Sequence, residues 1–153
     1  FGALGRISRR HAGIYVINPA STGSQTFSIA PTNGIRSIAI KIDEYSGVDT
    51  TTILNNVAGS QQTGDSMAQT ITTTDADGVI IGVVAASDET VAITMTTPAE
   101  TIDLEGQTGA ASQDLRAGFH DVDVAAAAAT EGLTFNQTGN LSAGMAIAEL
   151  NPA

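Results

Sequence analysis

Residues 35–45 read Ile-Arg-Ser-Ile-Ala-Ile-Lys-Ile-Asp-Glu-Tyr, and this stretch decides the fold class. Three isoleucines, at positions 38, 40 and 42, share one parity. The other parity carries small or polar residues: Ser37, Ala39, Lys41 and Asp43. Because side chains of a β-strand point alternately to the two faces of a sheet, this spacing predicts a strand with one buried face.

The same period of two recurs outward from this stretch. Between Thr90 and Thr96 the apolar positions 91, 93 and 95 alternate with Thr and Ala. Shorter alternating runs are Gln25, Phe27 and Ile29; Met67 and Ile71; Ile102 and Leu104; Leu133 and Phe135. Residues 79–84, Val-Ile-Ile-Gly-Val-Val, are apolar on both parities, which predicts a central strand covered on both faces, or a strand covered by a partner chain.

Turn signals separate these runs at roughly the 8–12-residue spacing of an all-β domain. They are Asn18-Pro19, Asn33-Gly34, Ser46-Gly47, Asp77-Gly78, Thr97-Pro98 and Gly139-Asn140. We therefore predict an antiparallel β-sandwich of jelly-roll or Ig-like type. It would form a single domain over residues 12–150, between an N-terminal arm (1–11) and a tail (151–153).

Two stretches depart from simple alternation. The apolar parity changes between Leu115 and Val124, which predicts a β-bulge. The five alanines at 125–129 leave two structures open. Helix propensity favours a short helical turn, and the alternative is a small-residue strand or loop packed closely against a neighbour.

Composition excludes several classes of protein. The chain of 153 residues has no Cys, so disulfide scaffolds and Cys-ligated metal sites are excluded. Its formal charge is −10, with six Lys and Arg against sixteen acids, which disfavours binding to nucleic acid. No apolar run of about 18 residues is present, so we expect no membrane span.

Charge is unevenly distributed along the sequence. Every residue up to Ile42 that carries a formal charge is Arg or Lys, whereas all the acids lie from Asp43 onward. This asymmetry suggests that a basic end docks on an acidic neighbour. The alternative is that strands from both parts interleave, so that the charges mix in space. The candidate docking residues of the arm are Leu4, Arg6, Ile7, Arg9 and Arg10.

The order of these signals resembles a β-sandwich module of phage virion proteins and of bacterial surface or secreted proteins. The segments that carry the resemblance are residues 13–19 (GIYVINP), 23–29, 45–49 (YSGVD), 72–80 and 143–150. The resemblance implies a structural role and one or two further strands before residue 13. Such a sandwich, without its first strands, would expose an edge and an apolar face that residues outside this sequence or another chain must cover.

Candidate chemical sites are few. Asp75 and Asp77 have the spacing that opens a calcium loop, but the twelfth position is Ala86 and not Glu, so the EF-hand pattern fails. Asp121 and Asp123 share one face of a predicted strand and are a second candidate for cation binding, against the simpler interpretation of a solvated face. No nucleophile or metalloprotease motif is present, and six aromatic residues are few for a sugar-cleaving cleft. We expect no enzyme activity, metal or cofactor.

The leading hypothesis is a phage structural protein at the virion surface, acting as a capsid decoration, head fibre or tail-associated module. Its partners would be other virion proteins or copies of itself. The alternatives are an extracellular or cell-surface module of a bacterium that binds host glycan or mediates adhesion, with binding loops at one end of the sandwich, and a filament subunit that exchanges strands.

Overall fold

Strands are the regular elements of this chain. The computed structural model describes residues 12–16, 23–24, 26–28, 38–86, 92–98, 103–107, 115–124 and 127–153. Within these ranges the only regular secondary structure is β-strand, which confirms the predicted all-β class, and no helix there is long and apolar enough to cross a membrane. The arm at residues 1–11, with its candidate docking residues, lies outside the described residues.

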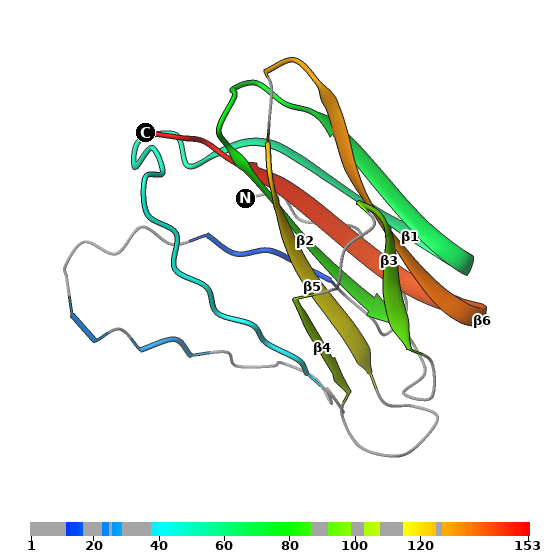
Figure 1. Cartoon of the computed structure of the whole chain (residues 1–153). Helices are drawn as coiled ribbons and strands as arrows, with labels where there is room; N and C mark the ends of the chain where they lie inside the picture. Colours follow the sequence, from blue (N-terminus) through cyan, green and yellow to red (C-terminus); the bar gives the residue numbers. More distant parts are fainter. Residues whose placement is uncertain are drawn as a thin grey trace.

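Six antiparallel strands form one continuous, nearly closed sheet (Figure 1). They are β1 (Leu54–Thr72), β2 (Val79–Ala86), β3 (Ile93–Thr97), β4 (Leu104–Gln107), β5 (Arg116–Asp123) and β6 (Thr130–Leu150). Their order is β1-β6-β2-β5-β4, and β3 pairs with β6 off this path. The prediction of antiparallel strands is confirmed, but a single hydrogen-bonded sheet replaces the two separate sheets of the predicted sandwich.

The two longest strands bend together. Residues 54–64 of β1 pair with residues 141–150 of β6, and residues 66–72 of β1 pair with residues 130–136. Between these ladders, residues 137–140 of β6 lie outside the register with β1, although Gln137 Nε2 donates a hydrogen bond to the carbonyl of Gly64 at 2.7 Å. Both ribbons turn back at this point, so the sheet folds over itself (Figure 1). Gly139-Asn140, predicted as a turn, therefore lies inside β6 at its bend.

Each half of β6 has a second neighbour. β2 pairs with residues 143–150 of β6, and β3 pairs with residues 134–137. The two halves face each other, because a Cβ atom added to Gly82 of β2 would collide with Cδ1 of Leu133 in the other half of β6. Apolar side chains from both halves fill the interior: Met67, Ile71, Ile80, Val84, Ile93, Met95, Leu133, Phe135, Met145 and Ile147.

Predictions for the later strands hold. β2 lies between β6 and β5 and is buried or half-buried throughout, as expected of a central strand. Ile93 and Met95 of β3 are buried and Thr94 is exposed, as the alternation predicts. The predicted bulge in β5 is wrong, because the register with β2 is continuous over the whole strand. The parity changes instead because β5 is buried on both faces around residues 117–118.

Predictions for the earlier strands fail in the part that the structure describes. Residues 38–45 belong to no strand, and their isoleucines are exposed rather than buried. Residues 26–28 also belong to no strand, and Phe27 is exposed, whereas Gln25 and Ile29 lie outside the described residues. These apolar side chains keep about half or more of their surface exposed, so alternation alone did not bury them.

The described part of the alanine run is a turn. Ala127 and Ala128 form the turn, and Ala128 has a φ of 56°, in the left-handed region. The N–H of Ala128 donates to the carbonyl of Thr73 at 2.8 Å, and the N–H of Thr73 donates to the carbonyl of Ala129 at 2.9 Å. The run therefore fastens the start of β6 to the end of β1.

Candidate functional site

Three isoleucines form an exposed apolar row on the extended segment 38–45. Ile38, Ile40 and Ile42 are 45%, 50% and 65% exposed, respectively. Single exposed apolar residues are ordinary, but a contiguous group on one face is typical of an interaction surface. We call these three residues the isoleucine row.

The alternate residues of this segment turn the other way. Ala39, Lys41 and Tyr45 are half-buried. The Lys41 Nζ atom lies 3.0 Å from Asp43 Oδ2 and 3.9 Å from Asp121 Oδ1 on β5. The Lys41–Asp121 pair places the side of the segment that carries Lys41 toward β5, and the isoleucine row lies on the opposite side.

The backbone of the segment is not paired with any other described part of the chain. Among the described residues, no backbone hydrogen bond joins residues 38–45 to another part of the chain. The next residues are fastened, since Val48 forms a β-bridge with Pro152 and the N–H of Asp49 donates to the carbonyl of Asn151 at 3.0 Å. The row therefore lies on an extended segment anchored at its C-terminal end.

Three acidic side chains surround Lys41 on the inner side of the segment. We call Asp43, Asp103 and Asp121 the carboxylate cluster. The N–H of Asp121 donates to Asp103 Oδ2 at 2.8 Å, and Nδ1 of the buried His120 lies 3.2 Å from the same oxygen. The three carboxylates are each between 35% and 38% exposed, so the cluster opens to solvent.

The two carboxyl groups of Asp103 and Asp121 titrate in opposite directions. Burial raises the pKa of Asp121, and the hydrogen bond to Asp103 raises it further. Burial also raises the pKa of Asp103, but hydrogen bonds from Asp121 and the charges of His120 and Lys41 outweigh it and lower the pKa. The cluster therefore holds a proton on Asp121 more readily than on Asp103.

The pKa of Tyr45 responds to the negative charge of the same carboxylates. Burial raises the pKa of its phenol well above the usual value, and the charges of Asp121 and Asp43 add to the effect. A phenolate at this position would face several carboxylates. The inner side of the segment is thus an environment that favours additional positive charge.

Asp75 and Asp77 lie in the turn between β1 and β2. Asp75 Oδ2 accepts a hydrogen bond from Asn55 Nδ2 at 3.0 Å. Asp77 has a φ of 64°, and its N–H donates to the carbonyl of Val124 at 3.0 Å. This bond places the turn against the end of β5, which carries Asp123.

The other candidate for cation binding, Asp121, belongs to the carboxylate cluster, whereas Asp123 is exposed at the end of β5. Across the ranges that the structure describes, no group of three or more His, Asp or Glu side chains is arranged to hold a metal ion.

Glu149 is a functional group that the sequence reasoning missed. Its side chain is fully buried on β6, where Oε1 accepts a hydrogen bond from the N–H of Thr74 at 2.9 Å. Its Oε2 accepts from Asn56 Nδ2 at 3.0 Å. A lone acid in the otherwise apolar run 143–150 was the available signal, and the carboxylate serves to fasten the β1–β2 turn.

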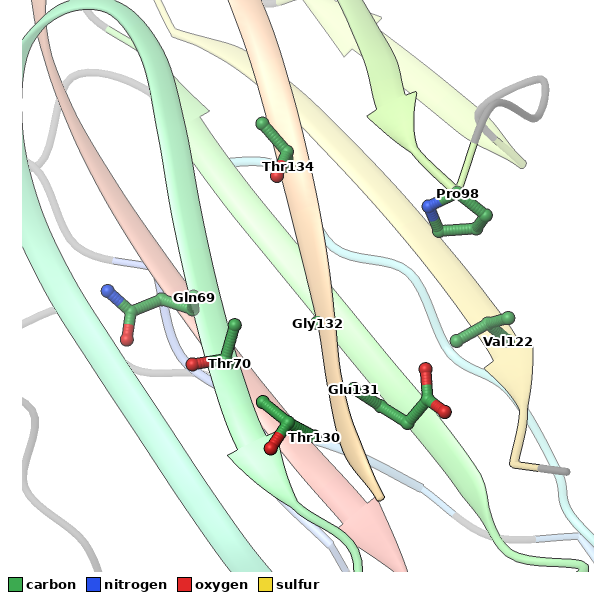
Figure 2. Close-up of a pocket in the computed structure, with 8 residues that line it drawn as sticks. All are labelled: Gln69, Thr70, Pro98, Val122, Thr130, Glu131, Gly132 and Thr134. Atoms are coloured by element: carbon green, nitrogen blue, oxygen red, sulfur yellow. The ribbon is translucent and has the colours of Figure 1, made fainter. Parts of the chain in front are cut away.

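A shallow pocket of about 220 Å³ lies beside the first half of β6 (Figure 2). Its lining is Gln69, Thr70, Pro98, Val122, Thr130, Glu131, Gly132 and Thr134. Glu131 is the single ionisable group in this lining, and no aromatic side chain is part of it. The pocket therefore presents neither a pair of acid–base groups nor a stacking platform for sugars.

Comparisons of the chain with protein-family models, with curated proteins and with solved structures find no match.

Proposed function

We propose that this chain is a structural module of a phage particle, located at the virion surface as a capsid decoration, head fibre or tail-associated subunit. Its partners are other virion proteins or copies of itself. It acts by burying surface and pairing strands, and this role requires no catalytic step or cofactor.

The observation that carries the proposal is the isoleucine row. Ile38, Ile40 and Ile42 lie exposed on an extended segment whose backbone makes no hydrogen bond to another described segment. A partner that covers the row would gain roughly 25 cal/mol for each Å² of apolar surface removed from water. A strand added alongside would also gain main-chain hydrogen bonds.

Other exposed apolar side chains support a protein-binding role. Tyr15 is 91% exposed, and Phe27 and Val57 are also exposed. Val57 lies on β1, which pairs with β6 alone among the described strands. Large apolar side chains at a sheet edge and on extended segments are features of surfaces that bind other chains.

The two-layer sandwich is part of this proposal. The sheet folds over itself at the bends of β1 and β6, and a partner strand along residues 38–45 would form a further strand pair beside it. We propose that the assembled module reaches the jelly-roll or Ig-like arrangement through such added strands.

The test uses the purified chain and particles from the source culture. We expect the chain to sediment as a concentration-dependent oligomer, and antibodies raised against it to label particles banded on a density gradient. A chain that is monomeric at every concentration and absent from purified particles contradicts the proposal. Specific retention on a glycan array by such a monomer would instead favour the adhesion alternative.

A further inference from the structure

The segment 38–45 offers a partner two different faces. One face carries the isoleucine row and ends in the exposed Glu44. The other face carries Lys41 and Asp43, beside Asp103 and Asp121. A strand lying along this segment would meet apolar groups on one side and carboxylates on the other, because side chains of paired strands share faces.

Among the described residues, the carboxylate cluster sets three acids against Lys41 and His120. Lys41 lies within ion-pair distance of both Asp43 and Asp121, and His120 is placed against Asp103. The acids Glu44 and Asp123 lie next to cluster members in the sequence and are exposed. Three carboxylates around one lysine therefore favour the arrival of a further cation.

The chain itself contains a segment of matching chemistry. Residues 1–11 contain three arginines, two large aliphatic residues and no acid. In an extended segment, Arg6 and Arg10 fall on one face, and Ile7 and Arg9 fall on the other. The first face matches carboxylates. The second matches an apolar row that ends in a glutamate, and guanidinium groups form strong hydrogen bonds with carboxylates.

We propose that residues 1–11 of a second copy of this chain dock along residues 38–45, with arginines on the carboxylate cluster and Ile7 on the isoleucine row. This inference rests on the proposed function, because it names the partner and the surface through which copies assemble. Each copy then both gives an arm and receives one. The contact is heterologous, so it builds rings or open chains of subunits.

The test compares the full chain with two charge variants. The arm variant is R6E/R9E/R10E, and the acceptor variant is D43K/E44K, which changes exposed residues outside the sheet. We expect each variant alone to self-associate at least about a hundredfold more weakly than the wild type, because like charges then meet at the contact. A control variant, Q62E/T63E/S66E, adds acid on the exposed positions of β1 and keeps the wild-type association.

Mixing the two variants gives the decisive measurement. The basic arm of the acceptor variant meets the acidic acceptor of the arm variant, and the acidic arm of the arm variant meets the lysines of the acceptor variant, so we expect the mixed variants to form a complex that neither forms alone. Its dissociation constant should rise with salt, since exposed charges are screened. Sedimentation of the mixture at several salt concentrations measures the size of the complex and its dissociation constant.

A mixture that remains monomeric, or an arm variant that assembles like the wild type, overturns the inference. Either result leaves the proposed function standing if antibodies still label the particles. A wild-type chain that is monomeric overturns the inference as well, and the proposed function fails with it only if the particles also lack the chain.

Discussion

The backbone of Gly82 on β2 lies directly against the side chain of Leu133 on β6. A Cβ atom at position 82 would collide with Cδ1 of Leu133, and Leu133 is fully buried. We therefore expect Gly82→Ala to destabilise the fold by about 1–3 kcal/mol through overpacking. Chemical denaturation measures the loss.

The double variant Gly82→Ala/Leu133→Val provides the control. The smaller valine makes room for the added methyl group, so the two changes should cost less together than the sum of their separate costs. Strictly additive losses would show that the two residues do not meet.

Replacing Glu149 by Gln should destabilise the protein by about 1–3 kcal/mol. The amide has one acceptor oxygen in place of two, so its own NH2 group meets either the N–H of Thr74 or Nδ2 of Asn56, donor against donor, at a fully buried position. The free energy of unfolding in denaturant measures the effect. Glu131→Gln, on the half-buried first part of β6, is the matched control and should change stability by less than about 0.5 kcal/mol. Equal effects of the two substitutions would contradict the anchoring role of Glu149.

Ile40→Lys should weaken self-association and leave the unfolding free energy within about 0.5 kcal/mol of the wild type, because the side chain is half exposed. Sedimentation and denaturation measure the two effects separately. Val57→Lys is the matched control, since it places the same charge on an exposed apolar position of β1. If Val57→Lys weakened self-association more than Ile40→Lys did, the result would indicate that copies meet at the edge strand β1 and not at the isoleucine row.

Asp121→Asn should raise stability at neutral pH by less than about 1 kcal/mol. Burial and Asp103 raise the pKa of Asp121, so its folded state holds the proton to higher pH than its unfolded state. The wild type therefore loses stability as pH rises from about 3.8 through the folded pKa, and the variant does not. The advantage should vanish in acid, where Asp121 is protonated in both states.

Denaturation at several pH values measures this difference between wild type and Asp121→Asn. The shift at Asp103 has the opposite sign, because its lowered pKa adds stability that is lost as pH falls below about 3.8. If Asp121→Asn were less stable than the wild type by the same amount at every pH, the raised pKa assigned to Asp121 would be wrong.

Tyr45 should resist ionisation. Its folded pKa is raised well above 10, so the native state loses stability as pH rises from about 10 toward that folded pKa. In a Tyr15→Phe background Tyr45 is the single tyrosine, and ultraviolet titration should show its phenol protonated until the protein unfolds. Adding Tyr45→Phe should flatten the alkaline dependence of stability. Reversible ionisation near pH 10 in the folded protein would contradict the assigned burial.

Alternation predicted the strands whose apolar faces meet within this chain. Met67, Ile93 and Phe135 are buried because a facing half of the sheet covers each of them. The apolar run at residues 79–84 became the central strand β2 for the same reason. For these strands, the strands that cover the apolar face belong to the same chain, so the local alternation of apolar residues was enough to predict burial.

Alternation did not predict the exposure of the isoleucine row. Alternation identified the two faces of residues 38–45 but not which face meets the sheet, because Lys41 reaches Asp121 from a distant part of the sequence. The carboxylate cluster was beyond prediction for a similar reason. Asp103 and Asp121 are neighbours only through the end of β4 and its pairing with β5.

The bent pairing of β1 with β6 has a consequence for synthesis. β1 leaves the ribosome before β6, the strand that completes its ladder, and β2 to β5 are translated between them. During that delay β1 and β2 lack their common neighbour, and unpaired strands of a nascent chain are prone to aggregate. Contacts between such distant parts of a sequence also form slowly. β1 therefore reaches its native pairing only after β6 has been translated, and a nascent-chain holdase would raise the yield of the protein.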